Sequence, residues 1–116
     1  MKKTLEKARQ LEREIAKFDK KDRPKFHLTP FVGWMNDPNG FSFYKGEYHL
    51  FYQYHPYNTF WDSMHWGHAV SKDLIHWKYL PVALAPESDY DSFGCFSGTT
   101  LELSDGNQLI MYTGVT

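Results

Sequence analysis

Cysteine, long apolar runs and a surplus of either charge are all missing from this 116-residue chain. Its single cysteine, Cys95, has no partner for an internal disulfide, so a small secreted scaffold held together by disulfides is excluded. Thirteen Lys and Arg side chains against fourteen Asp and Glu give a net charge of −1, which excludes nucleic acid and anionic lipid as partners held by bulk charge. No apolar segment reaches the ~18 residues that a membrane-spanning helix needs. The composition therefore favours one soluble domain.

The first twenty residues also lack the apolar core of a secretory signal, because charged side chains occur throughout them. Apolar residues recur there at spacings of three and four from Leu5 to Ile15, which predicts one amphipathic helix over residues 1–20. We expect this helix to dock on the rest of the protein. The alternative is a helix that binds a membrane surface or a partner, although its apolar stripe is narrow. The prediction is a cytoplasmic protein whose first unit, residues 1–22, is this helix.

Aromatic residues are abundant: 4 Trp, 8 Tyr and 9 Phe make up 18% of the chain, which is typical of β-rich proteins and of surfaces that stack on sugars. Alternating apolar residues and intervening turn residues predict antiparallel strands over 41–44, 48–54, 65–70, 75–79, 95–103 and 109–113. Successive four-stranded antiparallel units are the blades of a β-propeller. The fold prediction is therefore all-β, with about one and a half propeller blades in residues 23–116 after the N-terminal helix.

The densest functional signal is the segment Trp34-Met35-Asn36-Asp37-Pro38-Asn39-Gly40. Asp-Pro-Asn-Gly fits a β-turn that leads into a strand, and the residue before a proline is biased towards extended backbone. Such a turn would fix the direction of the Asp37 carboxylate, which could then project into a cavity beside the Asn36 amide. The alternative is that Asp37 only caps the turn through its own backbone.

Sugar recognition needs flat apolar faces that stack on C–H bonds, together with amide and carboxylate groups that pair with hydroxyls. Residues at expected strand ends and loops supply this mixture: Trp34, Asn36, Gln53, Trp61, Asp62, Trp66, Phe96 and Ser97. Any one of them could be a core aromatic or an exposed polar side chain. Together they indicate a sugar-binding site.

Other chemistries find less support. Among six histidines, His65 and His68 are the strongest metal candidates, but residues three apart on a strand face opposite sides, and neither Cys-x-x-Cys nor His-Glu-x-x-His occurs. Cys95 lies in a strand pattern with no basic neighbour to lower its pKa, so we expect it to be buried and not nucleophilic. A Gly-rich phosphate loop and a Gly-x-Ser-x-Gly motif are absent. No metal and no cofactor are therefore predicted.

From Lys25 onward the sequence resembles the start of the invertase-type glycoside hydrolases, family 32. The resemblance rests on ordered blocks: residues 34–40, Phe51-Tyr52-Gln53-Tyr54-His55-Pro56, residues 66–77 (Trp-Gly-His-Ala-Val-Ser-Lys-Asp-Leu-Ile-His-Trp), residues 80–84 (Leu-Pro-Val-Ala-Leu) and Phe96-Ser97-Gly98. The charged leading helix and the segment Arg23–Pro30 are similar to the intracellular bacterial branch of that family, the sucrose-6-phosphate hydrolases.

The resemblance implies a five-bladed β-propeller followed by a β-sandwich, and hydrolysis of terminal β-D-fructofuranosides such as sucrose or sucrose 6-phosphate with retention. Retaining glycosidases place two carboxyl groups ~5–5.5 Å apart, one as nucleophile and one as general acid/base. On the family's pattern the nucleophile is Asp37. The positions that match substrate contacts are Trp34, Met35, Asn36, Gln53, Trp61, Phe96 and Ser97. The expected partner is this small sugar, with no nucleic acid and no membrane.

Two further segments of the family's pattern do not occur in this sequence. One is Arg-Asp-Pro, whose Asp stabilises the transition state, and the other is Glu-Cys, whose Glu is the general acid/base; here Asp105 precedes Gly106 and Cys95 follows Gly94. We therefore expect the sequence to be the N-terminal piece of a longer enzyme, inactive alone. The alternative from a different class is a non-catalytic sugar-binding module, and a neighbouring enzymatic alternative is fructosyl transfer to a sugar.

Overall fold

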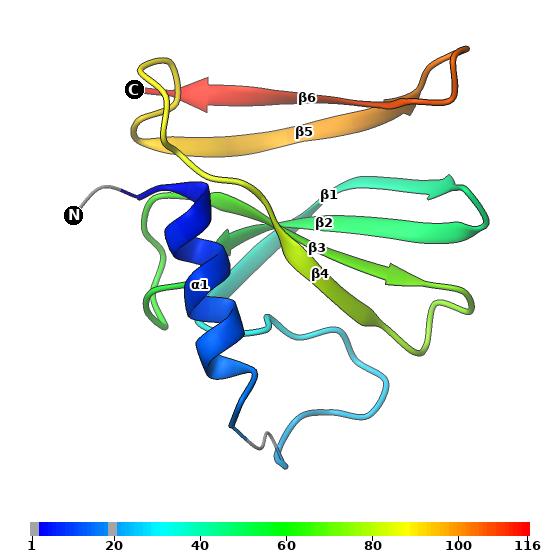
Figure 1. Cartoon of the computed structure of the whole chain (residues 1–116), viewed down its shortest axis with the longest axis horizontal. Helices are drawn as coiled ribbons and strands as arrows, with labels where there is room; N and C mark the ends of the chain where they lie inside the picture. The colour runs from blue at the N-terminus through cyan, green and yellow to red at the C-terminus, as the bar shows by residue number, and fades with distance from the viewer. Residues whose placement is uncertain (1–2, 19–20) are drawn as a thin grey trace.

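The computed structural model describes residues 3–18 and 21–116, which fold mostly into antiparallel β-structure (Figure 1). The strands β1 to β4 form a four-stranded sheet in chain order, and β5 pairs with β6 in a separate two-stranded sheet. The bounds of the elements are α1 Leu5–Ile15, β1 Trp34–Tyr44, β2 Glu47–His55, β3 His65–Ser71, β4 Lys78–Leu84, β5 Gly94–Glu102 and β6 Gln108–Val115.

The helix α1 is shorter than the predicted span of 1–20, of which residues 1–2 and 19–20 lie outside the described residues. It begins after Thr4, whose Oγ1 accepts a hydrogen bond from Lys7 N at 3.3 Å. Beyond its end the bonding changes to i→i−3 pairs, such as Phe18 N to Ile15 O at 3.0 Å. The apolar stripe ends there, because the Phe18 side chain is exposed and packs on no core. Without an apolar face to bury, the helix does not continue.

The predicted docking of α1 on the sheet is confirmed. Ala8 is fully buried in a core cluster with Tyr52 of β2 and Val82 of β4. Polar side chains of the helix reach the same edge strand: Arg9 Nε donates to Val82 O at 2.9 Å, and Glu12 Oε2 accepts from Val82 N at 3.1 Å. The helix therefore satisfies backbone groups that the edge strand β4 would otherwise expose.

The strand predicted over 48–54 is confirmed as β2, and the alternation of its side chains explains the two layers that cover the sheet. Tyr52 and Tyr54 face α1 and its core cluster. Phe51 faces the other way and packs with Trp66 of β3 and Cys95 of β5. The four-stranded sheet therefore lies between the helix and the β5–β6 hairpin, as Figure 1 shows.

The β-turn predicted at Asp37–Gly40 is wrong, because β1 runs through this segment. Pairing with β2 absorbs the turn residues as irregularities in the ladder: Met35 pairs with Tyr54 and Pro38 with Tyr52, which leaves two residues of β1 opposite one of β2. Proline is tolerated here because β1 lies at the edge of the sheet. Pairing with a long aromatic strand thus overrides the local turn preference.

A second shift of register follows at Gly40, whose φ of 54° is in the left-handed region. A Cβ atom at this position would lie 2.6 Å from Thr100 Cγ2 and 2.9 Å from the Phe51 ring. Glycine is therefore required both by the backbone conformation and by the close approach of β5. Thr100 Oγ1 also donates to Gly40 O at 2.9 Å, which ties β1 to β5.

The strand predicted over 75–79 is displaced along the chain to β4, Lys78–Leu84. The cause is the Asp73 carboxylate, which accepts hydrogen bonds from Ile75 N at 2.9 Å and His76 N at 2.8 Å and so holds residues up to 76 in a turn. The hydrogen bond from the His76 side chain is the main cause that lowers the pKa of Asp73, and the two backbone bonds lower it further.

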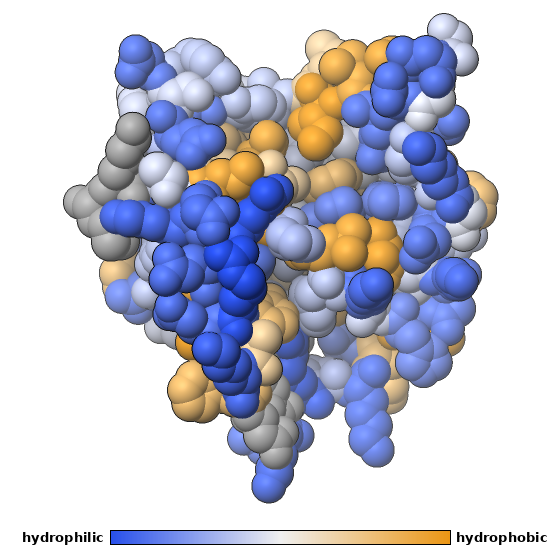
Figure 2. Space-filling view, in the orientation of Figure 1, coloured by the Kyte–Doolittle hydropathy of each residue, from blue (hydrophilic) through white to orange (hydrophobic). Residues whose placement is uncertain are grey.

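The outer surface of the β5–β6 hairpin is apolar. Leu101, Leu109 and Met111 have exposed side chains, and Figure 2 shows hydrophobic surface over the hairpin at the upper right. Within residues 3–18 and 21–116, no helix is long and apolar enough to cross a membrane.

Candidate active site

The first irregularity of β1 brings three predicted site residues to one level of the sheet. Because Met35 pairs with Tyr54 and Pro38 with Tyr52, the two residues between them on β1, Asn36 and Asp37, both lie opposite Gln53. Bulges of this kind redirect side chains and are frequent beside active sites. The bulge therefore brings the adjacent Asn36 and Asp37 to the level of Gln53, which lies sixteen positions after Asp37 in the sequence.

The carboxylate of Asp37 is exposed and engages no other described residue in a hydrogen bond or ion pair. Its backbone is held by the buried side chain of Asn39, whose Nδ2 donates to Asp37 O at 2.9 Å and whose Oδ1 accepts from Gly98 N at 3.0 Å. The Asp37 side chain makes no bond to the backbone of the described residues, so the alternative role of capping a turn is not observed. The Asp37 side chain remains available for chemistry.

Trp34 and Asn36 lie on the same face of β1 and contact each other. Trp34 Nε1 donates to Asn36 Oδ1 at 2.9 Å, which fixes the amide and leaves its NH₂ group free to donate elsewhere. Met35, between them, faces the opposite side and packs against the core cluster under α1. The structure therefore does not group the Met35 side chain with the other candidate residues.

Gln53 is buried, and its Nε2 donates to Cys95 O at 3.1 Å. On the neighbouring strand, Trp66 Nε1 donates to the next carbonyl, Phe96 O, also at 3.1 Å. These paired bonds fix the start of β5 against β2 and β3. Phe96, the residue after Cys95, therefore lies next to the part of the sheet that holds Gln53.

Phe96 belongs to an aromatic cluster that we call the aromatic wall, formed by Trp61, Phe93 and Phe96. Their ring centroids lie 6.1 to 6.2 Å apart. Trp61 is 42% exposed and Phe93 46% exposed, so two of the three rings face solvent. Aromatic side chains together with a few polar groups are typical linings of small-molecule binding sites.

Ser97 follows as an unpaired residue of β5. Phe96 pairs with Thr113 and Gly98 with Tyr112, so Ser97 has no counterpart on β6, and its side chain is exposed. Sequence reasoning found Ser97 and Phe96 but missed Phe93 and Asn39. For Asn39 a signal existed, since it lies within the motif, whereas no pattern singles out Phe93.

Two carboxylates on neighbouring segments, those of Asp62 and Asp91, are already engaged in hydrogen bonds. Asp62 Oδ1 accepts from Ser63 N at 2.6 Å, and this bond is the main cause that lowers the pKa of Asp62. Asp91 is buried and accepts from Tyr112 Oη at 2.8 Å and from Ser88 N at 2.8 Å. The described residues thus bring an unengaged carboxylate, that of Asp37, together with amide and aromatic side chains.

Comparison with known proteins decides the family. Residues 27–116 match the family model described as the glycosyl hydrolases family 32 N-terminal domain. This chain belongs to glycosyl hydrolase family 32. The fold prediction is confirmed at this level: the strands form the N-terminal β-propeller module of family 32, and a short helix precedes them.

Individual relatives agree with this family 32 assignment. A sucrose-6-phosphate hydrolase of Zymomonas mobilis is 59% identical over 91 residues, which are 78% of this chain and 18% of the relative. A solved β-fructofuranosidase of Bombyx mori has a TM-score of 0.78 and 46% identity, with 94% of this chain and 23% of that one covered. A sucrose-6-phosphate hydrolase structure from Lactobacillus gasseri has a TM-score of 0.77 and 40% identity, with 96% and 22% covered. The chain therefore spans about a fifth of the length of these relatives.

Three other reactive side chains of this family 32 module, those of His65, His68 and Cys95, are buried or half-buried. Burial is the main cause that lowers the pKa of His65 and of His68 to about 4. Cys95 is fully buried, as predicted, and burial with the adjacent Asp91 raises the pKa of its thiol. Among the described residues, no group of three or more His, Cys, Asp or Glu side chains could hold a metal ion.

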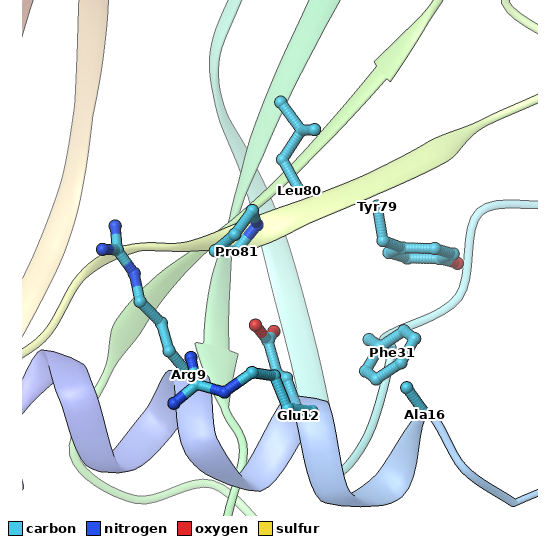
Figure 3. A pocket seen from close by; sticks show the side chains of 8 residues that line it. Arg9, Glu12, Ala16, Phe31, Tyr79, Leu80 and Pro81 are labelled. Carbon is cyan, nitrogen blue, oxygen red and sulfur yellow. The ribbon is translucent and has the colours of Figure 1, made fainter.

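A separate pocket of about 210 Å³ lies between α1 and β4. In Figure 3, Glu12 points from the helix towards β4, while Phe31 and Tyr79 lie together at one end. Its lining residues are Arg9, Glu12, Arg13, Ala16, Phe31, Tyr79, Leu80 and Pro81. None of the candidate sugar-site residues contributes to it.

Proposed function

We propose that this chain is the N-terminal part of a longer retaining β-fructofuranosidase that hydrolyses sucrose or sucrose 6-phosphate. The observation that carries the proposal is the exposed, unengaged carboxylate of Asp37 on a bulge that also holds Asn36 opposite the amide of Gln53. The names of the relatives support the substrate class, because they are sucrose-6-phosphate hydrolases and β-fructofuranosidases.

The proposed reaction has two displacements at the anomeric carbon of fructose. A carboxylate oxygen of Asp37 attacks the anomeric carbon while the bond between that carbon and the oxygen of the leaving sugar breaks. The oxygen of the leaving sugar takes a proton from a general acid. Water then attacks the anomeric carbon and gives a proton to the former general acid, which now acts as a base. This second step releases fructose and the Asp37 carboxylate. The general acid/base is not among the residues of this chain to which we assign a role.

The remaining residues bind and orient the fructosyl group. The bond from Trp34 Nε1 turns the NH₂ group of Asn36 away from its partner, where it can donate to a hydroxyl. Gln53 keeps its side-chain oxygen and one hydrogen for the sugar after donating to Cys95 O. Trp61 and Phe96 supply apolar faces for the sugar, and the exposed Ser97 supplies a hydroxyl.

The test is the substitution Asp37→Asn in the full-length enzyme. The amide has nearly the same shape but cannot form the glycosyl ester, so turnover of sucrose and of sucrose 6-phosphate should be abolished with the fold unchanged. Asp105→Asn is a matched control, because Asp105 is exposed on the β5–β6 turn and bonds only locally to Asn107. Residual activity of Asp37→Asn above about a tenth of wild type would refute the assignment.

A second candidate is a non-catalytic sugar-binding module. It is favoured by the carboxylates Asp62 and Asp91, which are both engaged in hydrogen bonds within the described residues and so are not free to serve as the acid partner of Asp37. Calorimetric titration with fructose and sucrose separates the two functions. A full-length protein that binds these sugars and never releases fructose would be such a module.

A further inference from the structure

One backbone carbonyl in the loop between β2 and β3 accepts hydrogen bonds from two buried histidines. Ser63 O accepts from His65 Nδ1 at 2.9 Å and from His55 Nδ1 at 3.4 Å. His65 is fully buried, and His55 and Ser63 are each at most 3% exposed. His55 is the last residue of β2 and His65 the first of β3, so the two histidines hold the loop at its base.

The chemistry of this contact shows which ring nitrogen of His65 carries the hydrogen. A carbonyl oxygen can only accept, so Nδ1 must carry the hydrogen. Burial lowers the pKa of His65 to about 4, which keeps the ring neutral near pH 7 and leaves Nε2 without a hydrogen. His65 Nε2 has no hydrogen-bond partner among the described residues. The side chain therefore acts through Nδ1 alone.

The clamped carbonyl lies between two parts of the candidate active site. Two residues before it is Trp61, whose ring packs against Phe96. On the other side, Met64 O accepts a hydrogen bond from Cys95 N at 2.8 Å, and Cys95 directly precedes Phe96 in the chain. A shift of Ser63 would therefore move Trp61 relative to Phe96.

We propose that His65, assisted by His55, is a positioning residue that fixes loop 56–64 so that Trp61 stands against Phe96 in the aromatic wall. The inference rests on the proposed function, since it assigns the positioned ring to sugar binding. It differs from two other roles for His65, namely filling space in the core and binding an unidentified group through Nε2.

Two substitutions of His65 separate these roles. Asn places an amide nitrogen close to the position of Nδ1 and preserves the donor to Ser63 O, whereas Gln places its nitrogen close to Nε2 and loses that donor. In the full-length enzyme, His65→Gln should raise KM for sucrose about tenfold with kcat within about twofold, because ground-state and transition-state contacts of Trp61 are lost together. His65→Asn should retain the wild-type KM.

A second measurement reports on Trp61 without using activity. Acrylamide quenching of each variant is compared with that of the same variant carrying Trp61→Phe, so that the difference belongs to Trp61. His65→Gln should make Trp61 more accessible to quenching, and His65→Asn should not. If His65→Gln fails to fold, the pair His55→Asn and His55→Gln poses the same question at the longer bond.

The outcomes are distinct. Equal KM and equal Trp61 quenching in the Asn and Gln variants would overturn the clamp, and a normal Gln variant beside a defective Asn variant would assign the function to Nε2 instead. If the wild-type enzyme releases no fructose from sucrose or sucrose 6-phosphate, the proposed function fails. The quenching comparison still decides the clamp in that case.

Discussion

The contact of Asn39 with both Asp37 and β5 allows a quantitative prediction. Its side chain is 3% exposed and makes two hydrogen bonds, of 2.9 Å to Asp37 O and 3.0 Å from Gly98 N. Asn39→Ala would leave a carbonyl and an N–H without these partners at a part-buried position. An unsatisfied buried group costs about 1–3 kcal/mol, and because these two groups are only partly buried we expect a combined loss in the lower part of that range for each, about 2–4 kcal/mol in the free energy of unfolding.

The same substitution should impair catalysis, because the bonds of Asn39 fix the backbone that carries Asp37. A displacement of a catalytic group by about 1 Å can cost on the order of a hundredfold in rate. We therefore expect kcat of Asn39→Ala to fall by about ten- to a hundredfold with a smaller change in KM.

The assay combines urea unfolding with initial rates of fructose release by the full-length enzyme. Asn107→Ala is the matched control, since Asn107 also bonds through its side chain but on the exposed β5–β6 turn. It should change stability by less than about 0.5 kcal/mol. An Asn39→Ala variant with the stability and kcat of the Asn107 control would refute the argument.

Two other predictions follow from the site and from the buried histidines. Phe93→Ala should raise KM for sucrose several-fold while Phe93→Tyr stays close to wild type, because the ring at this position extends the aromatic wall; unchanged steady-state kinetics of the Ala variant would remove Phe93 from the site. His68 has a folded-state pKa of about 4, depressed below the 6.5 of the unfolded chain chiefly by burial, so its stabilising contribution is complete above pH 6.5 and is lost as pH falls towards 4. Urea midpoints of wild type should decline from pH 7 to pH 4.5 more steeply than those of His68→Asn, and parallel curves would contradict this prediction.

The sequence predicted those parts of the fold in which alternation and burial agree. The tyrosines and phenylalanine of β2 have the same alternation in the sequence and in the sheet, and the helix docks as expected, whereas the layer formed by the β5–β6 hairpin was not predicted. Local turn propensity failed at Asp37–Gly40, where pairing with a distant strand decides the conformation. It also failed at Asp73, whose carboxylate lengthens a turn that the pattern assigned to a strand.

The candidate site was predicted in its residue types more than in its geometry. The motif pointed to Asp37, but the bulge that sets Asp37 opposite Gln53 depends on strand register, which local patterns do not reveal. Phe93 and the clamp of His55 and His65 on Ser63 arise from contacts across segments. The assigned roles of the site residues, the boundary at residue 22 and the cytoplasmic location stay predictions.

The most direct test of the central claim is mass spectrometry of the full-length enzyme quenched in acid during turnover of sucrose. The account predicts that the peptide containing Asp37 gains the mass of one fructosyl group, that fragmentation places the group on the Asp37 carboxylate, and that Asp37→Asn lacks it. A fructosyl group trapped on another residue, or an active enzyme that forms no adduct under conditions where the intermediate accumulates, would contradict the role of Asp37 as nucleophile.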